Sequence, residues 1–437
     1  MTATIGIRLE DKNHWERRVP LVPDDVARLI QGGLRVVVQS SPTRTFSDDE
    51  YRAVGAEVAP NLDDCDVIFA VKEIPMDKLF PGRPHVFFAH VIKGQSYNMP
   101  LLRYLLDERI TLIDYERIAD DAGSRLVFFG GEAGQAGMID SLHVLGQRLA
   151  WEGTENPFSD IQQAYHYEDL EAAKAAVREA GRRLAEGKLE LDDGPLVVGF
   201  TGRGHVSQGA WDVFDELPHE VVEPEDLERV CEEHAGTSDR IFKVNFQKHH
   251  LAQPTEEGKA FDEAEYRAHP ELFKGGRLVR YVPYLTVLMH GVYWTDDYPR
   301  FLTRKEVSSL WKAGSRKLRV FGDVTCDVNG SINLTYKATS PDDPTYVYDP
   351  VKDAFNDGHE GEGVVVLAVD NLPCELPRDS SRHFSAMLVK QVEAIAGADY
   401  SQPFDALTLP PALRRAVITH QGELTPDYEY LREYLDE

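Results

Sequence analysis

The sequence predicts an α/β protein built of two Rossmann-like domains, each with a mostly parallel sheet. Several apolar runs lack a polar residue at every second position, which is typical of strands covered on both faces. Helix-length segments separate many of these runs, as parallel strands require. A glycine-rich turn follows one run and precedes a helical segment, as in a dinucleotide-binding unit. With 437 residues, the chain is long enough for two separate cores.

The first part of the chain alternates between strand and helix signals. Residues 5–8 (IGIR) and 34–39 (LRVVVQ) predict strands, and residues 24–30 between them predict a helix that begins near Pro23. Further strands are expected over the apolar runs at 67–71, 86–89 and 110–115. We expect these runs to lie in one parallel sheet.

The middle of the chain carries a second series of strands. A charged amphipathic helix is predicted from Glu168 (EDLEAAKAAVREAGRRL) before the series begins. Residues 224–280 are polar and give no clear strand signal, and within them we expect a helix at 256–266. The tail from 388–395 onward predicts a helix. The expected strands lie at 196–201, 221–223, 284–289, 318–323 and 363–369.

Composition excludes several classes of function. The 47 Lys and Arg residues against 74 Asp and Glu residues give a net charge of −27, which repels the phosphates of nucleic acids. We see no basic leader at the N-terminus, and no window reaches the ~18 consecutive apolar residues of a membrane span. We therefore expect a cytoplasmic protein without a metal, in which His249 and His250 form an ordinary surface. The cysteines match neither a zinc site nor a disulfide framework: Cys65, Cys231, Cys326 and Cys374.

The turn FTGRGHVSQGA, at 200–210, predicts the dinucleotide site. Gly202 allows the tight turn, and Gly204 allows backbone N–H groups to approach a pyrophosphate at a helix N-terminus. Glu223 follows at about the 20-residue distance expected of a ribose-binding acid. The alternative is a purely structural turn between a strand and a helix. The predicted cofactor residues here are Gly202, Arg203, Gly204, His205, Val206 and Glu223.

A second glycine-rich segment competes with this loop. LVFFGGEAGQAG, at 126–137, also places glycines after an apolar run. However, a long helical pattern follows at 138–151, with no second strand within the ~30 residues of a βαβ unit. We interpret the segment as part of the helix that joins the two domains, with small residues that allow close packing near the cofactor.

Ionisable residues end the apolar runs of the first domain. In a parallel sheet, ligands bind beyond the carboxyl ends of the strands, so these residues are candidates for a site. A lysine flanked by carboxylates can move protons, and an arginine can bind a carboxylate bidentately. Taken singly, each of them is more often solvated or structural. The cluster comprises Glu16, Arg17, Arg18, Lys72, His90, Lys93 and Glu116.

The residues of this cluster and of the glycine loop resemble one family along nearly the whole chain. The chain is similar to the lysine–2-oxoglutarate reductase half of bifunctional aminoadipic semialdehyde synthase and, more distantly, to fungal lysine-forming saccharopine dehydrogenase and alanine dehydrogenase. The saccharopine-oxidising half has no counterpart here. The motifs that carry the resemblance are WERRVPLVP, FAHVIK, TLIDYE, AGQAGM, FTGRGHVSQGA, GVYW, DVTCDVNGS, VDNLP and AVIT.

The resemblance implies the reaction and the domain plan. Lysine would condense with 2-oxoglutarate, and NAD(H) or NADP(H) would reduce the imine to saccharopine. The family fold implies a substrate-binding domain over 1–140 plus 376–437, a dinucleotide-binding domain over 141–375, and an active site in the cleft between the domains. A separate saccharopine-oxidising enzyme is a further expected partner.

The resemblance also implies roles for single residues. Lys72 and His90 match acid–base groups of the fungal enzyme. Glu16 and Glu116 match residues that tune the lysine, and Arg18 matches a substrate-binding arginine, beside which we place Arg17 and Lys93. Residues on the nicotinamide side would be Asp327, Asn371 and Leu372.

Two other functions remain open at this point. One is an amino-acid dehydrogenase of the alanine type, which would use ammonia in place of lysine. The other is a non-catalytic module that kept the fold. The choice between NAD and NADP is open as well, because Glu223 would repel a 2′-phosphate whereas Arg203 offers a compensating charge.

Overall fold

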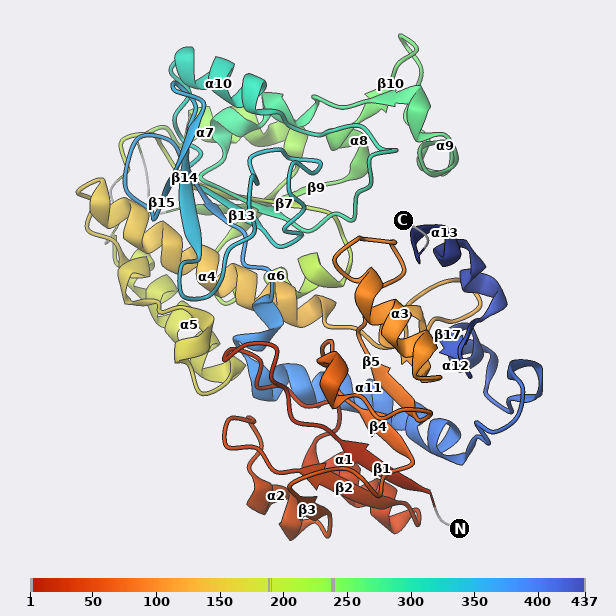
Figure 1. Ribbon diagram of the computed structural model, residues 1–437. Helices are drawn as coiled ribbons and strands as arrows, with labels where there is room; N and C mark the ends of the chain where they lie inside the picture. Colours follow the sequence, from red (N-terminus) through yellow and green to blue (C-terminus); the bar gives the residue numbers. More distant parts are fainter. Residues whose placement is uncertain (1–2, 188, 190, 237–239, 436–437) are drawn as a thin grey trace. The chain divides into compact units, whose positions relative to one another are not determined.

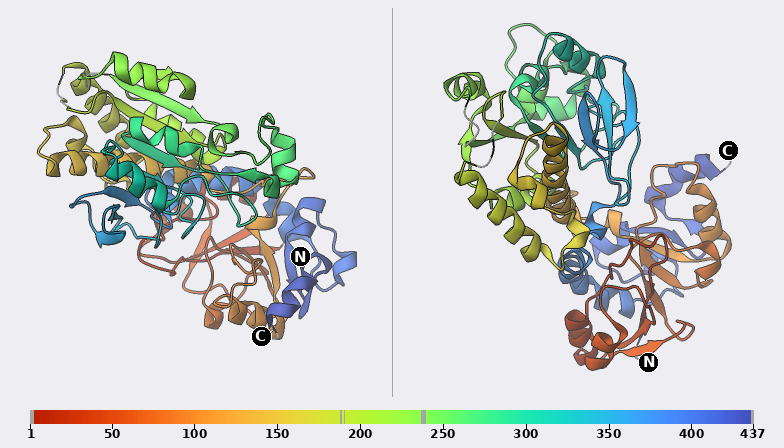
Figure 2. Two further views of the ribbon diagram at one scale, coloured as in Figure 1. Left: turned by 90° about the horizontal axis from the view of Figure 1, so that it is seen from above. Right: turned by 90° about the vertical axis from the view of Figure 1, so that its left-hand side faces the viewer.

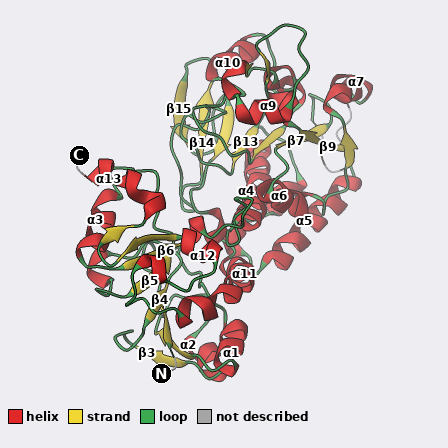
Figure 3. Ribbon diagram, turned by 90° about the vertical axis from the view of Figure 1, so that its right-hand side faces the viewer, coloured by secondary structure: helices red, strands yellow, loops and turns green. Residues whose placement is uncertain are grey.

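The chain forms two compact units, each with its own eight-stranded sheet (Figure 1). The computed structural model describes residues 3–187, 189, 191–236 and 240–435. The first unit takes in Met1–Phe129 and Pro377–Glu437, and the second takes in Gly130–Leu376. In each unit, helices lie around a central sheet (Figure 3). The two mostly parallel sheets confirm the predicted fold class.

The sheet of the first unit has the strand order β18-β17-β6-β5-β4-β1-β2-β3. β1 to β6 pair in parallel, whereas β17 and β18 join the edge in antiparallel fashion. The strands are β1 (Thr4–Ile7), β2 (Arg35–Gln39), β3 (Glu57–Ala59), β4 (Val67–Phe69), β5 (Pro84–Phe87), β6 (Thr111–Asp114), β17 (Val417–His420) and β18 (Glu423–Leu424).

Helices from both ends of the sequence belong to the first unit. They are α1 (Pro23–Gln31), α2 (Asp48–Ala53), α3 (Met99–Asp107), α11 (Pro377–Gly397), α12 (Pro411–Arg415) and α13 (Arg432–Leu435). α11 packs against α1, and the views in Figure 2 show its blue ribbon beside the red N-terminal part. Its Ser381 and Ser385 hydroxyls accept the N–H groups of Val19 and Val22, each at 3.0 Å. The returning tail is therefore tied to the segment that precedes α1.

The sheet of the second unit has the order β15-β14-β16-β13-β12-β7-β9-β8. Its strands are parallel except β14 and β15, which form an antiparallel edge. The strands are β7 (Leu196–Thr201), β8 (Glu220–Val222), β9 (Ile241–Phe246), β12 (Val287–His290), β13 (Val320–Asp323), β14 (Thr345–Asp349), β15 (Ala354–Asp357) and β16 (Val364–Leu367).

Cores cover both faces of this second sheet. The face that includes Val198 and Phe200 packs against α4, α5 and α6. The opposite face, which includes Val197, shares a core with α7 and α10. The helices are α4 (Gly130–Trp151), α5 (Leu170–Ala185), α6 (His205–Phe214), α7 (Leu227–Glu233), α8 (Lys248–Leu251), α9 (Glu263–Ala268) and α10 (Arg304–Lys312). Burial on both faces explains why these strands read as continuous apolar runs.

Two expectations for 224–280 were wrong or incomplete. The helix expected at 256–266 is only the short α9, which begins at Glu263. The stretch before it belongs to a loop flanked by β10 (Gln253–Pro254) and β11 (Phe273–Lys274). The polar region also contains β9, which lies in the middle of the sheet beside β7. The charged Lys243 interrupts the apolar run of this strand, so the strand was not predicted. Lys243 is nevertheless buried, and its Nζ lies 2.5 Å from Asp215 Oδ1.

The second glycine-rich segment lies inside a helix. α4 begins at Gly130, so the glycines of the 126–137 segment belong to a helix and do not form a loop. A Cβ at Gly134 would lie 1.9 Å from the Val206 carbonyl oxygen, and one at Gly209 would lie 1.9 Å from the Gly131 carbonyl oxygen. Small residues therefore let α4 and α6 pack backbone to backbone. Among the described residues, no helix is both long and apolar enough to cross a membrane.

Candidate functional site

Candidate residues of the first unit follow three neighbouring parallel strands. β4, β5 and β6 lie side by side, and Lys72, His90 and Glu116 follow them in turn. Because parallel strands share one carboxyl edge, the three residues leave the sheet at the same edge. The structure thus brings the predicted strand-end residues to one edge of the sheet, and their catalytic roles remain predictions.

His90 has an unusual backbone conformation, and its ring contacts the carboxylate of Glu73. Its φ of 54° lies in the left-handed region, which non-glycine residues seldom adopt. Its Nδ1 lies 2.5 Å from Glu73 Oε1, while Glu73 Oε2 lies 2.7 Å from the Lys12 Nζ. Burial opposes ionisation of Glu73, yet the hydrogen bond and charge of His90 and then those of Lys12 lower its pKa to about 2. Glu73 is therefore an ionised carboxylate, and in this form it orients the His90 imidazole.

Lys72 has an amine with a perturbed proton affinity. Burial lowers the pKa of Lys72, and the positive charges of Arg18 and Lys12 lower it further, against the opposing charges of Glu16 and Glu73. A lowered pKa leaves a larger neutral fraction near physiological pH. The amine is therefore suited to accept and return a proton.

Arg18 is engaged by a protein carboxylate in this structure. Arg18 and Glu16 are each 2% exposed. The Arg18 Nε and Nη2 donate to the two Glu16 carboxylate oxygens at 2.8 Å and 2.6 Å, and the guanidinium lies 4.3 Å from the centre of the Phe129 ring. A substrate carboxylate would have to displace Glu16 or share the guanidinium with it. The neighbouring Arg17 is exposed, and its Nε donates to the Thr43 carbonyl oxygen at 3.1 Å.

The remaining predicted residues of the first unit, Lys93 and Glu116, both reach its surface. Lys93 is exposed, and half-buried Glu116 pairs with Arg125 at 2.5 Å. Asp114, which received no role from the sequence, accepts the N–H groups of Ala89 and Glu116 at 3.1 Å and 2.8 Å. Burial raises the pKa of Asp114 to about 6.

Sequence reasoning missed ionisable residues that contact this edge: Glu10, whose carboxyl group accepts the Val71 and Lys72 N–H groups, Glu73 and Asp114. Glu73 directly follows Lys72, and Asp114 ends an apolar run, so both carried the strand-end signal already used for the other candidates. Glu10 carried no such signal, because it lies in the polar stretch RLEDKNHW after the first strand.

The glycine loop of the second unit has three glycines with different environments. Gly202 has a φ of 86° and makes the turn after β7. Gly209 lies against α4, as described above. Gly204 precedes the first turn of α6, and a Cβ placed there would have no heavy atom within 4 Å. The space beside Gly204 is therefore open, and the backbone can be approached there by a ligand.

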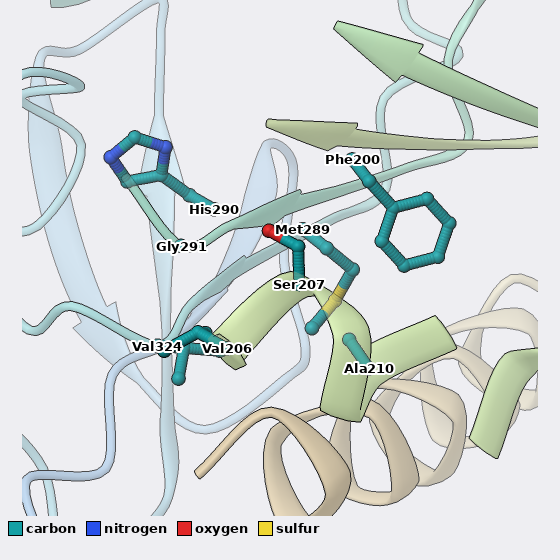
Figure 4. Close-up of a pocket in the computed structure, with 8 residues that line it drawn as sticks. All are labelled: Phe200, Val206, Ser207, Ala210, Met289, His290, Gly291 and Val324. Atoms are coloured by element: carbon teal, nitrogen blue, oxygen red, sulfur yellow. The ribbon is translucent and has the colours of Figure 1, made fainter. Parts of the chain in front are cut away.

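A small cavity lies beside this loop (Figure 4). Its lining is mainly apolar, and its polar groups are already paired. Ser207 Oγ donates to the Thr201 carbonyl oxygen at 3.0 Å, and the His290 ring nitrogens lie 2.7 Å from Thr201 Oγ1 and 2.8 Å from Ser331 Oγ. Burial lowers the pKa of His290 to about 3, so the ring is neutral. The lining residues are Phe200, Val206, Ser207, Ala210, Met289, His290, Gly291 and Val324.

Glu223 lies one strand away from the glycine loop. It is exposed and follows β8, which pairs with β9 and not with β7. The residues that follow β9 border the loop instead, because the Gly202 N–H donates to the Phe246 carbonyl oxygen at 3.3 Å. Those residues are Gln247, Lys248 and His249.

Residues predicted on the nicotinamide side follow β13 and β16, which are adjacent and parallel. Asp327 lies in the turn after β13, where its backbone N–H donates to Thr325 Oγ1 at 3.3 Å. Asn371 and Leu372 follow β16. Leu372 is 2% exposed and belongs to the core around α4, so only its backbone is suited to ligand contact.

One group of side chains has the composition of a metal site. The ligand atoms of Glu225, His249 and His250 lie within 4.8 Å of one another. However, His250 Nδ1 accepts the Gln247 N–H at 2.9 Å, and its Nε2 lies 3.0 Å from Glu225 Oε1. This bonding places the ring proton on Nε2, which would otherwise be the metal ligand. The arrangement therefore favours a structural hydrogen-bonded chain.

Comparison with known proteins places the chain in a family. The N-terminal domain of alanine dehydrogenase/PNT matches residues 6–136, and the C-terminal domain of the same family matches residues 292–427. Among solved structures, an L-alanine dehydrogenase covers 99% of this chain and 99% of its own, with a TM-score of 0.59 and 19% identity. This structural likeness shows the fold.

Curated relatives match nearly the whole chain. Alpha-aminoadipic semialdehyde synthase of Arabidopsis thaliana is 39% identical over 98% of this chain, which spans 41% of that protein. Saccharopine dehydrogenase (NAD(+), L-lysine-forming) of Neurospora crassa is 28% identical over 87% of this chain and 88% of its own length. The chain therefore belongs to the alanine dehydrogenase/PNT family and matches, over nearly its whole length, less than half of an alpha-aminoadipic semialdehyde synthase.

Proposed function

We propose that the chain condenses L-lysine with 2-oxoglutarate and reduces the resulting imine to saccharopine. The observation that carries this proposal is the 39% identity to an alpha-aminoadipic semialdehyde synthase over 98% of this chain. A lysine and a histidine at neighbouring strand ends, each surrounded by charged partners, provide the acid–base groups that such a reaction needs. A reduced nicotinamide, when bound, would supply the hydride.

Protons must leave and enter at the reacting nitrogen and oxygen atoms. Imine formation removes two protons from the ε-amine of the substrate and releases the keto oxygen as water. The Lys72 amine, with its lowered pKa, would take up a proton from the substrate amine near neutral pH. His90, oriented by Glu73, would deliver protons to the departing oxygen. Arg17 or Arg18 would bind a substrate carboxylate, and Lys93 would add positive charge for the same purpose.

The second unit would bind the dinucleotide at the loop from Gly202 to Val206. The N-terminus of α6 stabilises negative charge, and the open space at Gly204 admits a pyrophosphate. Exposed Arg203 and His205 stand in the same turn. Asp327, Asn371 and the backbone of Leu372 would lie on the nicotinamide side.

The residues next to the loop favour NADP(H) as the cofactor. In a dinucleotide-binding sheet, the strand beside the glycine-loop strand presents the residue that reads the adenosine ribose, and an acid there selects NAD. Here that strand is β9, and Lys248 and His249 follow it, whereas Glu223 follows the more distant β8. Part of the Lys248 charge is offset by Glu263, at 3.4 Å. The Lys248 side chain is the group suited to contact a 2′-phosphate.

The cellular compartment and the partner enzyme of this chain are also proposals. All four cysteines are free thiols, which suits a reducing compartment such as the cytoplasm. The chain spans between 41% and 48% of the bifunctional relatives that it matches. A separate saccharopine-oxidising enzyme is the functional partner that we propose.

Consumption of reduced nicotinamide tests the proposal directly. Turnover of NADPH or NADH should require lysine and 2-oxoglutarate together, because the transition state contains both. Ammonia with pyruvate should be a poor pair by orders of magnitude, and Lys72→Met serves as the inactive control. Turnover with ammonia and pyruvate alone would assign an alanine-type dehydrogenase. Cofactor binding without turnover of any pair would assign a non-catalytic module.

A further inference from the structure

The carboxylate of Glu10 bridges two consecutive backbone N–H groups just beyond β4. Glu10 Oε1 accepts the Val71 N–H at 2.6 Å, and Oε2 accepts the Lys72 N–H at 3.0 Å. One side chain therefore fixes the backbone of the residue that carries the amine.

These N–H groups need a partner because the neighbouring strand has ended. A backbone bond from the Arg8 N–H to the Phe69 carbonyl oxygen, at 2.8 Å, ends the pairing of β1 with β4. On the opposite side, the Phe88 N–H still donates to the Val71 carbonyl oxygen at 3.0 Å. A buried N–H without an acceptor costs about 1–3 kcal/mol. The Glu10 carboxylate thus takes the place of the missing strand beside β4.

The same contact lies in a strongly charged region. Burial raises the pKa of Glu10 to about 7, and the charge of Glu16 acts in the same direction, against the two backbone bonds and Arg8. Burial is also the main cause of the lowered pKa of Lys72. Any release of the backbone after β4 would let water reach the Lys72 amine and remove that perturbation.

We propose that Glu10 is a positioning residue for Lys72, which it holds by the backbone so that the amine stays desolvated at the carboxyl edge of the sheet. The proposal rests on the acid–base role proposed above for Lys72. Loss of Glu10 should act through Lys72, and it should leave cofactor affinity unchanged because the dinucleotide loop belongs to the other unit. A misplaced reacting group can cost about 10²-fold in rate.

Glu10→Ala and Glu10→Gln test this role against a matched control. Asp66 Oδ2 accepts the Thr4 N–H at 2.7 Å, so Asp66→Asn neutralises a similar carboxylate acceptor at the other end of the same strand pair, as Glu10→Gln does at Glu10. Turnover and cofactor affinity are measured for each variant. The pKa of Lys72 is measured separately, from the pH dependence of its labelling by an amine-reactive reagent, read by mass spectrometry.

We expect Glu10→Ala to lower kcat by about 10- to 100-fold and to raise the Lys72 pKa toward its ordinary 10.5. Glu10→Gln keeps one acceptor oxygen and should show smaller effects of the same sign, and it decides the question if Glu10→Ala does not fold. Asp66→Asn should lower the melting temperature only.

Two results would overturn the proposal. One is a folded Glu10 variant with wild-type labelling and wild-type kcat. The other is an Asp66→Asn variant that changes the Lys72 pKa as much as the Glu10 variants do. If the wild type turns over no lysine and 2-oxoglutarate, the proposed function fails instead, and the labelling titration still decides whether Glu10 controls Lys72.

Discussion

Substitution of Gly204 by valine separates ligand binding from folding at the glycine loop. A Cβ at this position meets no heavy atom within 4 Å, and the backbone has an ordinary φ of −77°, so valine fits the free protein. The added methyl groups would occupy the space in which a pyrophosphate approaches the N-terminus of α6. We therefore expect NADPH affinity to fall more than about tenfold, or roughly 1.4 kcal/mol, with the melting temperature close to that of the wild type.

Calorimetric titration with NADPH and with NADH measures the affinity, and thermal unfolding followed by circular dichroism measures the stability. Gly397→Val is the matched control for the substitution itself, because a Cβ at exposed Gly397 also meets nothing within 4 Å and lies in the other unit. It should change neither quantity by as much as Gly204→Val changes the affinity.

Gly209→Ala provides the opposite pattern. Its Cβ would lie 1.9 Å from the Gly131 carbonyl oxygen, so α4 and α6 would have to separate. Overpacking of this kind costs about 1–3 kcal/mol of stability. Unchanged NADPH affinity in a folded Gly204→Val variant would refute the assignment of the loop. The structure predicts no folding defect in this variant, so its affinity reports on binding alone.

Three further predictions follow from the two sites. Lys72→Met and His90→Gln should each lower kcat, by about 10²–10⁴-fold for a general acid–base group, with NADPH affinity unchanged by calorimetry. Because Glu73 has a pKa of about 2 in the folded protein against an ordinary 4.5, its contribution to stability is present above pH 4.5 and is lost as the pH falls toward 2. Denaturant titrations should therefore show a weaker loss of stability across that interval in Glu73→Gln. Lys248→Ala should weaken NADPH binding more than NADH binding, by about tenfold if one charged hydrogen bond to the 2′-phosphate is lost; equal losses for both dinucleotides would contradict the ribose assignment.

The strand ends of the first unit were predictable because one physical signal marks them. A strand buried on both faces is apolar until it leaves the sheet, so the first ionisable residue after each run reports where the strand ends. Lys72 and His90 carried that signal directly, Glu116 follows Asp114 at the end of the third run, and the three strands concerned are adjacent in the sheet. Contacts such as that of Glu10 with the N–H groups of Val71 and Lys72 join residues about 60 positions apart and have no local pattern.

The ribose side of the second unit shows why chain order is a poor guide to strand order. Glu223 was placed by its distance along the sequence from the glycine loop, a rule that assumes that the next strand in the chain is the next strand in the sheet. Here the next strand, β8, lies at the edge, and β9 enters between it and β7. The charge of buried Lys243, whose amine contacts the exposed Asp215, made β9 look like a polar loop. Because neighbours in the sheet and not neighbours in the chain border the ligand, the residues that follow β9 replace Glu223 as the groups expected to distinguish NADP from NAD.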